Sequence, residues 1–418
     1  MTISKGFMLK KIKFKYGKTF CDIELPEKAD LLSIREPLLF INKKKFSADF
    51  SLKLPKKLSS HHTISIVIAD KTRLCGYKTY LPWILEILLQ KGIKNQQITF
   101  FIAYGTHARQ SDKECLNVYG DLYQTYRFIH HDCNDKNLFT CLGKTPKGTK
   151  VHIRKDLIKS DLIITFGALS HHYFAGYGGG RKLLFPGLGY KPDIYQNHGL
   201  FLDKTLKKLS PGCQPGNLEN NPLARDLKEI DDFIEPQRIS IHGILDSKAM
   251  VCQLIVGKTY NDFLTACKTL DTYYKTKVKR QYDLVIASCG GFPKDINFIQ
   301  AHKAINNASM FVKDNGRLVV LTECNDGIGS DTFIEYFRYH DFCQAFNVLE
   351  KDYKGNGGTA LSMMTKTKRI NIFLKTALND KTCETIGTQK IEEDMIQTLI
   401  KKFQHDMACI KNASLLIR

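Results

Sequence analysis

The chain has 418 residues, 43% of them hydrophobic and 25% charged, which is typical of a soluble globular protein. This length exceeds what one ordinary hydrophobic core organises, so we expect two domains. No apolar run approaches the roughly 20 residues of a membrane-spanning helix, and the N-terminal residues lack the apolar stretch of a secretory signal. The 13 cysteines are scattered without a Cys-x-x-Cys pair, which favours reduced thiols in the cytoplasm over a disulfide framework or a zinc ribbon.

The formal net charge of +20 raises the question of a nucleic-acid partner. The lysines are spread along the chain rather than gathered in one basic tract. We find no aromatic RNA-binding signature, recognition-helix motif or zinc-finger spacing. We therefore expect neither nucleic acid nor a membrane as the main partner, and a basic RNA-binding protein with purely structural motifs stays as an alternative.

Apolar runs that indicate buried strands alternate with helical stretches in the first part of the chain. Residues 9–25 alternate polar and apolar side chains about Tyr16-Gly17-Lys18, which predicts a β-hairpin. Strands are predicted over Thr63–Ala69, Ile98–Ala103, Tyr126–His130 and Asp161–Phe166, and helices over Tyr80–Gln90 and from Ser111 onward. This rhythm is typical of an open α/β sheet, which binds ligands at the carboxyl ends of its strands.

A second α/β segment follows in the last third of the chain. A helix over Leu264–Gln281 runs into a basic connector, and strands are predicted over Tyr282–Ser288 and Arg317–Thr322. Residues 391–409 have helical spacing and are expected to pack back on the body. We predict two α/β domains, 1–275 and 276–418, each with an open, mostly parallel sheet flanked by helices. The first would be the catalytic domain, with the active site in the cleft between the two.

The segment Ser170–Gly189 (SHHYFAGYGGGRKLLFPGLG) is the richest in functional residue types. Its glycines let the backbone approach an anion closely, and they lead directly to Lys182. A tight surface loop with solvated charges is the alternative. The segment approaches a phosphate-binding P-loop, but it lacks the glycine before the lysine and has Leu183 where a hydroxyl should bind Mg²⁺. We therefore do not expect a nucleoside triphosphate.

Two histidines and an Asp–Arg pair stand at predicted strand ends. His107 and His172 suit a pair of general bases in an open site, although structural histidines explain the spacing equally well. Arg73 suits a carboxylate or a phosphate, and a local ion pair with Asp70 explains their spacing equally well. No histidine or cysteine spacing indicates zinc. Any metal must therefore be assembled from distant residues or arrive with a cofactor.

Taken together, these motifs resemble the nickel-pincer-dependent lactate racemase family. The resemblance rests on Asp70-x-Thr72-Arg73, Gly105-Thr106-His107, the block HYFAGYGGGRK over 172–182, His198, and Gln300-x-x-Lys303. The block is the most specific of these pieces, and the pieces run along most of the chain.

The resemblance implies a cofactor derived from nicotinic acid mononucleotide that holds nickel in a sulfur–carbon–sulfur pincer (pyridinium-3,5-bisthiocarboxylic acid mononucleotide nickel). It assigns covalent attachment of this nickel-pincer nucleotide to Lys182 and nickel coordination to His198, and imidazole suits nickel. Further contacts to the cofactor are expected from Asp70, Arg73, Gly178, Gly179, Gln300 and Lys303. Proteins that make and deliver the cofactor are the implied partners.

The resemblance also implies an isomerase that racemises or epimerises a 2-hydroxy acid by hydride transfer through a 2-keto acid. His107 and His172 would exchange the hydroxyl proton on opposite sides. Arg73, Ile299, Gln300 and Lys303 are the expected substrate contacts.

Ile299 departs from the family, which has a tyrosine at this position. Its side chain cannot donate a hydrogen bond, so we expect a 2-hydroxy acid other than lactate. We expect His302 on the helix surface. An enzyme on the same fold in which Lys182 forms a Schiff base with a carbonyl substrate or pyridoxal phosphate is the main alternative.

Overall fold

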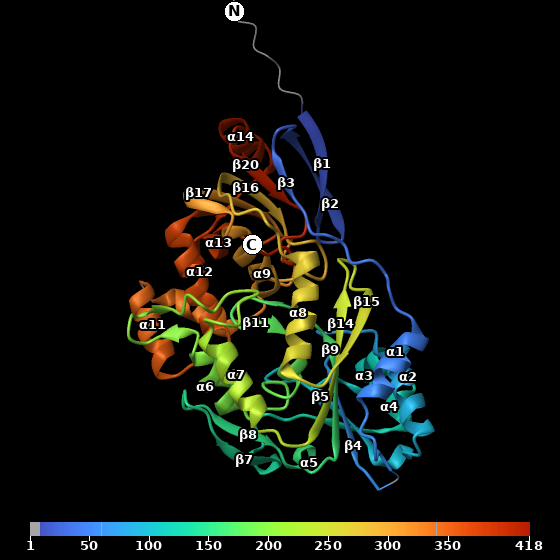
Figure 1. Cartoon of the computed structure of the whole chain (residues 1–418). Coiled ribbons are helices and arrows are strands. Elements are labelled where there is room, and N and C mark those ends of the chain that lie inside the picture. Colours follow the sequence, from blue (N-terminus) through green and yellow to red (C-terminus); the bar gives the residue numbers. More distant parts are fainter. Residues whose placement is uncertain (1–8, 60, 340) are drawn as a thin grey trace, which may run out of the picture. The chain divides into compact units, whose positions relative to one another are not determined.

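The computed structural model describes residues 9–59, 61–339 and 341–418, which form two compact units (Figure 1). The glycine-loop unit comprises Glu36–Phe201 and Ser210–Tyr273. The C-terminal unit comprises Tyr274–Arg418, Leu202–Leu209 and the described part of Met1–Arg35. No pattern in the residues indicated that the N-terminal hairpin belongs with the last third of the chain. The predicted domain ranges, 1–275 and 276–418, remain a proposal beside this division, and the units are described separately.

A mostly parallel sheet forms the centre of the glycine-loop unit, in the strand order β15-β14-β9-β4-β5-β6. Its strands are β4 (Ile64–Ala69), β5 (Ile98–Ala103), β6 (Arg127–His130), β9 (Leu162–Ala168), β14 (Gln237–Leu245) and the antiparallel edge strand β15 (Val251–Gly257). The four strands predicted from apolar runs are confirmed. Every residue of β4 is buried, as a β-branched run at the centre of a parallel sheet requires. Strands β14 and β15 were not predicted.

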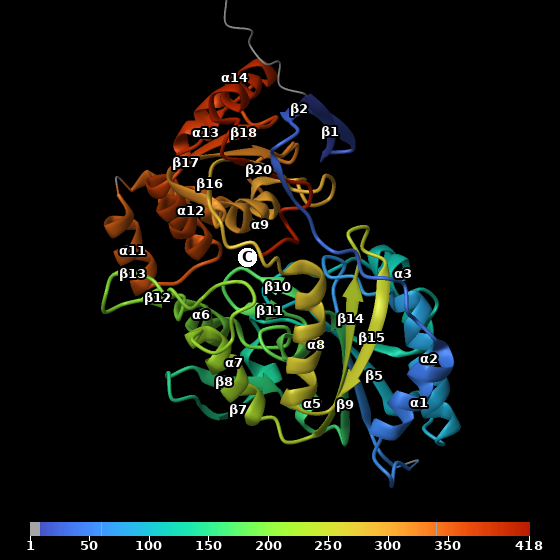
Figure 2. The same cartoon turned by 45° about the horizontal axis from the view of Figure 1, so that its top comes forward.

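Helices flank this sheet on both sides (Figures 1 and 2). On one side lie α1 (Lys43–Lys53) and α2 (Tyr77–Gln90), and on the other α8 (Tyr260–Tyr274). The helix predicted from Ser111 is α3 (Asp112–Tyr119), and the Ser111 and Glu114 side chains cap its first turn reciprocally. The unit also contains α4 (Leu122–Thr125), α5 (Lys155–Ile158), α6 (Lys191–Gly199), α7 (Pro222–Asp232), the hairpins β7 (Phe139–Lys144)–β8 (Lys150–Arg154) and β10 (Ser170–His172)–β11 (Gly176–Gly178), and the 3-10 turns η1 (Asn95–Gln97), η2 (Lys136–Leu138) and η3 (Gly180–Leu183).

The C-terminal unit is built on a second sheet, in the order β19-β18-β17-β16-β20-β3, in which every neighbouring pair is parallel. Its strands are β3 (Asp30–Leu32), β16 (Tyr282–Ser288), β17 (Val312–Leu321), β18 (Asn371–Lys375), β19 (Gln389–Lys390) and β20 (Met407–Ile410). The predicted strand over 282–288 is confirmed residue for residue. The expectation of helical structure throughout 391–409 is wrong at its end, because only α14 (Glu393–Phe403) is helical. The short, fully buried run that forms β20 has no periodicity that distinguishes strand from helix.

Alternate residues of the second sheet pack into separate cores on its two faces. Leu284 and Ile286 of β16 join a core with α14 and the predicted hairpin, β1 (Leu9–Tyr16) and β2 (Thr19–Pro26). Val285 and Ala287 join the other core. That core includes α9 (Phe298–Ser309), α11 (Phe342–Lys351) and α12 (Gly357–Arg369). This is the two-residue alternation of a strand buried on both faces.

Short elements complete the C-terminal unit: α10 (Asp331–Ile334), α13 (Asp380–Thr385), η4 (Glu335–Arg338), β12 (Leu202–Asp203) and β13 (Lys208–Leu209). All 13 cysteines are free thiols. None of the helices over the described residues combines the length and the apolar composition needed to span a membrane.

Candidate functional site

The polar strand-end residues of the glycine-loop unit gather at one edge of its sheet. Asp70 directly follows β4, His107 follows β5, and β10 with His172 follows β9. These three strands are neighbours and run parallel, so their carboxyl ends lie side by side. The backbone N–H of Gly105 donates to the carbonyl of Gly187 (2.8 Å), which joins the His107 loop to the glycine-rich segment.

Asp70 orients the first histidine. Its carboxylate is 3% exposed, and Oδ2 accepts a hydrogen bond from His107 Nδ1 at 2.6 Å. Oδ1 accepts from the Thr72 N–H (2.8 Å) and hydroxyl (2.6 Å). Burial alone would raise the pKa of Asp70, but the hydrogen bonds and charge of His107 and the bonds from Thr72 lower it, so the carboxylate stays ionised. The Nδ1 proton of His107 therefore points at Asp70, and Nε2 of this half-exposed ring is left to accept a proton.

Arg73 does not form the local ion pair that its spacing allowed. Both Asp70 oxygens are engaged by His107 and Thr72, and no Asp70–Arg73 ion pair occurs among the described residues. The Arg73 guanidinium is exposed and donates to the Thr72 carbonyl at 3.1 Å. It is therefore available to an anion.

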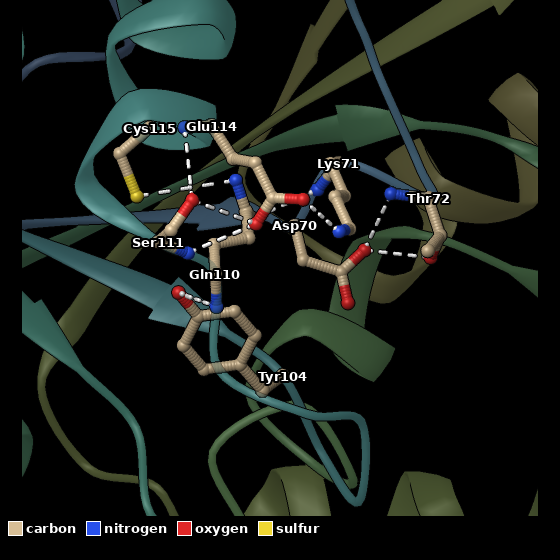
Figure 3. A network of polar contacts seen from close by, with 8 residues as sticks. All are labelled: Asp70, Lys71, Thr72, Tyr104, Gln110, Ser111, Glu114 and Cys115. Atoms are coloured by element: carbon tan, nitrogen blue, oxygen red, sulfur yellow. Dashed lines mark hydrogen bonds and ion pairs between the residues drawn. The ribbon is translucent and has the colours of Figure 1, made fainter.

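A polar network braces the loops that carry Asp70 and His107 (Figure 3). The Gln110 side chain accepts from the Lys71 N–H (2.9 Å), and the Gln110 N–H donates to the Tyr104 hydroxyl (3.2 Å). Lys71 also forms an ion pair with Glu114, the residue that caps α3 with Ser111. The loops after β4 and β5 are thus tied to each other and to α3.

His172 lies on the β10–β11 hairpin, whose tight turn depends on glycine. Gly176 has φ +77°, and a Cβ there would meet the Asn217 carbonyl oxygen at 2.3 Å. The Ala175 N–H donates to His172 Nδ1 at 3.3 Å. Because this nitrogen accepts, the proton of the neutral ring is on Nε2. His107 and His172 therefore present opposite forms of Nε2, one an acceptor and the other a donor.

The glycines after β11 bring the chain close to the end of β9. At Gly179, with φ +82°, a Cβ would meet the Ala168 carbonyl oxygen at 2.3 Å, and at Gly178 one would meet the Ser170 hydroxyl at 3.1 Å. Lys182 follows in η3. Burial, and then the charges of Arg73 and Arg181, lower the pKa of Lys182 to about 7. A large fraction of this amine is therefore neutral, and so nucleophilic, near neutral pH.

Phe174, which sequence reasoning missed, brings three candidate groups to one ring. The His172 ring lies edge-on to it, with centroids 4.5 Å apart, and the His198 ring lies at 5.2 Å. Lys182 Nζ lies 5.8 Å from the centroid. The position of Phe174 between His172 and Lys182 was the only available signal, and it does not reveal that His198 on α6 comes to the same ring.

His198 has the surroundings of a metal ligand. Its Nδ1–H donates to the Ile194 carbonyl (2.7 Å), and such a backbone carbonyl is a common second contact of metal-binding histidines. Burial, and then the charge of Lys182, lower the pKa of His198 to about 4, so the ring is neutral. No group of three His, Cys, Asp or Glu side chains that could hold a metal occurs among the described residues. A nickel that brings most of its own donors and takes one imidazole therefore fits these residues.

Three predicted site residues belong to the other unit. Lys303 Nζ donates to Gln300 Oε1 (2.7 Å) on α9. Ile299 packs against the hydrophobic core of that unit, and its N–H donates to the Ile328 carbonyl (3.1 Å). Their roles stay predictions. His302 was expected on the helix surface, and this is wrong: its side chain is 1% exposed.

His302 is buried because α9 is enclosed on most of its circumference. Burial, and then the charges of Lys366 and Lys303, hold the pKa of His302 well below its usual value.

Two family models match the chain. Residues 16–209 match the lactate racemase N-terminal domain, and residues 277–354 match the lactate racemase C-terminal domain. The lactate racemase of Thermoanaerobacterium thermosaccharolyticum is 29% identical over 276 residues, which cover 66% of this chain and 63% of that protein. The lactate racemase of Lactiplantibacillus plantarum is 28% identical over 286 residues, 67% of this chain and 65% of that protein. The chain thus spans slightly less than two thirds of the length of the curated relatives that it matches.

Two solved structures share the fold. The lactate racemase apoprotein from T. thermosaccharolyticum superposes with a TM-score of 0.83 at 22% identity, over 98% of this chain and 99% of that one. A protein from Thermotoga maritima superposes with a TM-score of 0.68 at 14% identity, over 91% and 99% of the two chains.

Proposed function

The chain belongs to the lactate racemase family, and from that premise we propose that it is an isomerase that racemises or epimerises a 2-hydroxy acid. One observation carries the proposal: His107 and His172 follow strands whose carboxyl ends lie at the same edge of one sheet, and Asp70 accepts from Nδ1 of His107. Inverting a carbon that bears a hydroxyl requires a base for the proton of one enantiomer and an acid for the other.

In this proposal the chain's own residues bind the substrate and move its proton. The exposed Arg73 guanidinium binds the carboxylate, and Lys303 with Gln300 adds polar contacts. His107 Nε2 takes the hydroxyl proton while Asp70 stabilises the imidazolium that forms. His172 acts as the acid in its imidazolium form: it returns the Nε2 proton to the oxygen of the planar 2-keto acid and becomes neutral. In the reverse direction the two histidines exchange roles.

The nickel-pincer nucleotide is the proposed cofactor, and it would supply hydride acceptance and return at Cα when bound. Lys182, whose amine has its pKa lowered to about 7, would carry it covalently, and His198 Nε2 would ligate its nickel. Asp70, Gly178 and Gly179 are the remaining proposed contacts. This assignment rests on the donor set around Phe174 and on the family.

The proposed substrate class is wider than lactate. Lactate is the natural first compound to test, because it is the substrate in the names of the curated relatives. Ile299 cannot hydrogen-bond a polar substituent, so we favour a 2-hydroxy acid with an apolar side chain larger than methyl. The free thiols support a cytoplasmic location, and proteins that make the cofactor are the proposed partners.

The test is a chiral assay over a panel of 2-hydroxy acids, with the protein produced in a host that makes the cofactor. We expect interconversion of at least one enantiomer pair, one nickel per chain, and a covalent adduct in the intact mass. A protein that carries nickel and adduct yet inverts no member of the panel would contradict the activity. A protein without adduct or nickel in such a host would contradict the cofactor.

The Schiff-base alternative draws on the same lysine. An amine with its pKa lowered to about 7 also suits imine formation with a carbonyl compound. Borohydride trapping at Lys182 in the absence of nickel would favour it. The RNA-binding alternative treated the strand-end motifs as purely structural. We do not pursue it, because those motifs lie within the two segments that match lactate racemase domains.

A further inference from the structure

Helix α8 contacts both strands of the hairpin that carries His172. Asp271 Oδ1 accepts a hydrogen bond from His171 Nε2 at 2.7 Å. The Tyr177 hydroxyl donates to Oδ1 and Oδ2 of the same carboxylate at 2.8 and 2.9 Å. His171 of β10 and Tyr177 of β11 are directly paired across the hairpin. One carboxylate therefore fastens both strands to the helix, and Figure 2 shows β10 and β11 beside α8.

The ion pair between His171 and Asp271 is largely shielded from solvent. The His171 side chain is 6% exposed and that of Asp271 is 26% exposed. Burial, and then the charge of Asp271, raise the pKa of Tyr177, so its hydroxyl remains a donor. Hydrogen bonds to an ionised partner in such surroundings are shorter and stronger than neutral ones.

The geometry of a strand links this contact to His172. Successive side chains of a strand point to opposite faces, so His171 and His172 project in opposite directions from β10. Strand β10 has three residues and pairs only with β11. A rotation about the strand axis would swing the His172 ring. The turn of the hairpin is held separately, where the Gly216 N–H donates to the Gly176 carbonyl at 2.9 Å, so the Asp271 contact is the one that fixes the strands to α8. Fixing His171 on one face therefore fixes His172 on the other.

The same helix holds the neighbouring lysine segment by different chemistry. The Arg181 guanidinium lies 5.3 Å from the Tyr260 ring centroid and 4.9 Å from that of Phe263, both near the start of α8. Its Nη2 donates to the Ala224 carbonyl at 3.1 Å. Helix α8 thus supports the segment at two separate points, one beside His172 and one beside Lys182.

We propose that Asp271 is a positioning residue for proton transfer, which holds His172 in its working orientation by clamping His171 and Tyr177 to α8. The proposal rests on the proposed role of His172 as an acid/base. Asp271 touches neither substrate nor cofactor in this role, and its effect is confined to the histidine and leaves the lysine attachment intact.

The experiment compares Asp271→Asn with the wild type, both loaded with cofactor. The amide keeps the size of the side chain but loses its charge and one acceptor. Because small displacements of a reacting group are costly, we expect kcat to fall about 10- to 100-fold while KM changes less than about threefold. Adduct occupancy at Lys182, measured by intact mass, should equal that of the wild type. Asp271→Glu restores the charge and should recover part of kcat.

Asp262→Asn is the matched control. It is the same substitution on the same helix, at a carboxylate that accepts from the Lys258 and Thr259 N–H groups and does not contact the hairpin. Its kcat should stay within about twofold of the wild type. If Asp271→Asn does not fold, Tyr177→Phe removes one of the two clamp donors and retains the ring, and a smaller loss of kcat is expected.

A second readout does not depend on turnover. Nitrogen-15 NMR of labelled histidine, with the His172 signals assigned from His172→Gln, reports the tautomer and surroundings of the ring. We expect the His172 signals to move in Asp271→Asn and not in Asp262→Asn. If the wild type inverts no 2-hydroxy acid but these signals move, the proposed function fails and the clamp stands. Wild-type kcat with unmoved signals in Asp271→Asn, or a loss of kcat matched by a loss of adduct, would overturn the clamp.

Discussion

The carboxyl edges of the two sheets differ in whether their polar groups are already hydrogen-bonded within the chain. Each has six strands and is wholly or mostly parallel, so each gathers strand-end loops at its carboxyl edge. In the C-terminal unit that edge is filled by the chain itself. The Ser288 hydroxyl donates to the Lys15 carbonyl (2.5 Å), Asp295 Oδ2 accepts from the Gly17 N–H (2.7 Å), and the Phe292 N–H donates to the Gly17 carbonyl (2.8 Å).

In the glycine-loop unit the corresponding polar groups are side chains that keep capacity for a ligand. His107 is half exposed with its Nδ1 fixed by Asp70, and the Arg73 guanidinium is exposed. Position at a strand end therefore does not by itself indicate a binding site. What distinguishes the two edges is whether the hydrogen-bonding groups are already consumed by another segment of the chain.

The largest expected effect of a single change is at Lys182. Lys182→Ala should abolish both the covalent adduct and racemisation, because no other amine stands beside Phe174 in the described residues. Intact mass and the chiral assay measure these. Lys155→Ala, at an exposed lysine of α5, is the control and should retain both. An adduct that persists in Lys182→Ala would show that the attachment is elsewhere.

Removing either histidine should cost somewhat less. We expect His107→Gln and His172→Gln to lower kcat by about 10²- to 10⁴-fold, the usual contribution of general acid–base catalysis. Both variants should lose rate with either enantiomer, because each direction needs one histidine as the base and the other as the acid. His61→Gln, at an exposed position, is the control. A variant of either histidine that retains the wild-type kcat would argue against its role in proton transfer.

At His198 the expected effect is on the metal. His198→Ala should lower nickel content measured by elemental analysis, while the adduct at Lys182 remains, because the pincer donors do not come from the chain. His131→Ala is a matched control: this ring is also buried, but its Nε2 bonds to the Gly189 carbonyl (3.1 Å). Unchanged nickel in His198→Ala would remove the ligand assignment.

Asp70 should show an effect on stability that depends on pH. The pKa of Asp70 is lowered in the folded chain, so its ionised form favours folding above the unfolded-state pKa of about 3.9, and this contribution is lost as pH falls through the folded value. The difference in free energy of unfolding between the wild type and Asp70→Asn should therefore be constant near neutral pH and shrink below pH ~4. Urea titrations at several pH values measure it, and a difference that grows on acidification would contradict the assigned state.

The smallest effect is expected at the carboxyl edge of the C-terminal sheet, which the N-terminal hairpin fills. Ser288→Ala removes the hydrogen bond to the hairpin and the acceptor of the Gly290 N–H, and it should lower the free energy of unfolding by about 1–3 kcal/mol, with kcat unchanged. Chemical denaturation and the chiral assay together test it. A large loss of kcat without loss of stability would mean that this edge also takes part in the reaction.

Local patterns were sufficient to predict the buried strands and the N-terminal hairpin, because apolar runs and the Tyr16-Gly17-Lys18 turn act over a few residues. They were not sufficient where a contact joins distant segments. The pairing of His171 and Tyr177 with Asp271 on α8 depends on the position of a helix about a hundred residues away in sequence. The same holds for the meeting of His198 with Phe174.

Errors in the prediction have the same origin. His302 is polar and was assigned to the surface, but α9 is enclosed by the core of its unit. The motif residues themselves were identified from sequence, whereas their tautomers and bracing were not, because these depend on hydrogen bonds between loops.

The edge strand β3 has a consequence for how the protein is made. Residues 30–32 pair with residues 408–410, so β3 finds its neighbour only after all the residues between the two strands have been synthesised. The apolar face of the N-terminal hairpin likewise packs on β16 and α14, which are translated after the glycine-loop unit. Long-range pairing of this kind slows folding, and it leaves apolar surface and an unpaired strand exposed until the partner segments have been made. The glycine-loop unit lies between these segments in the chain, so it can finish folding while the hairpin still awaits its sheet.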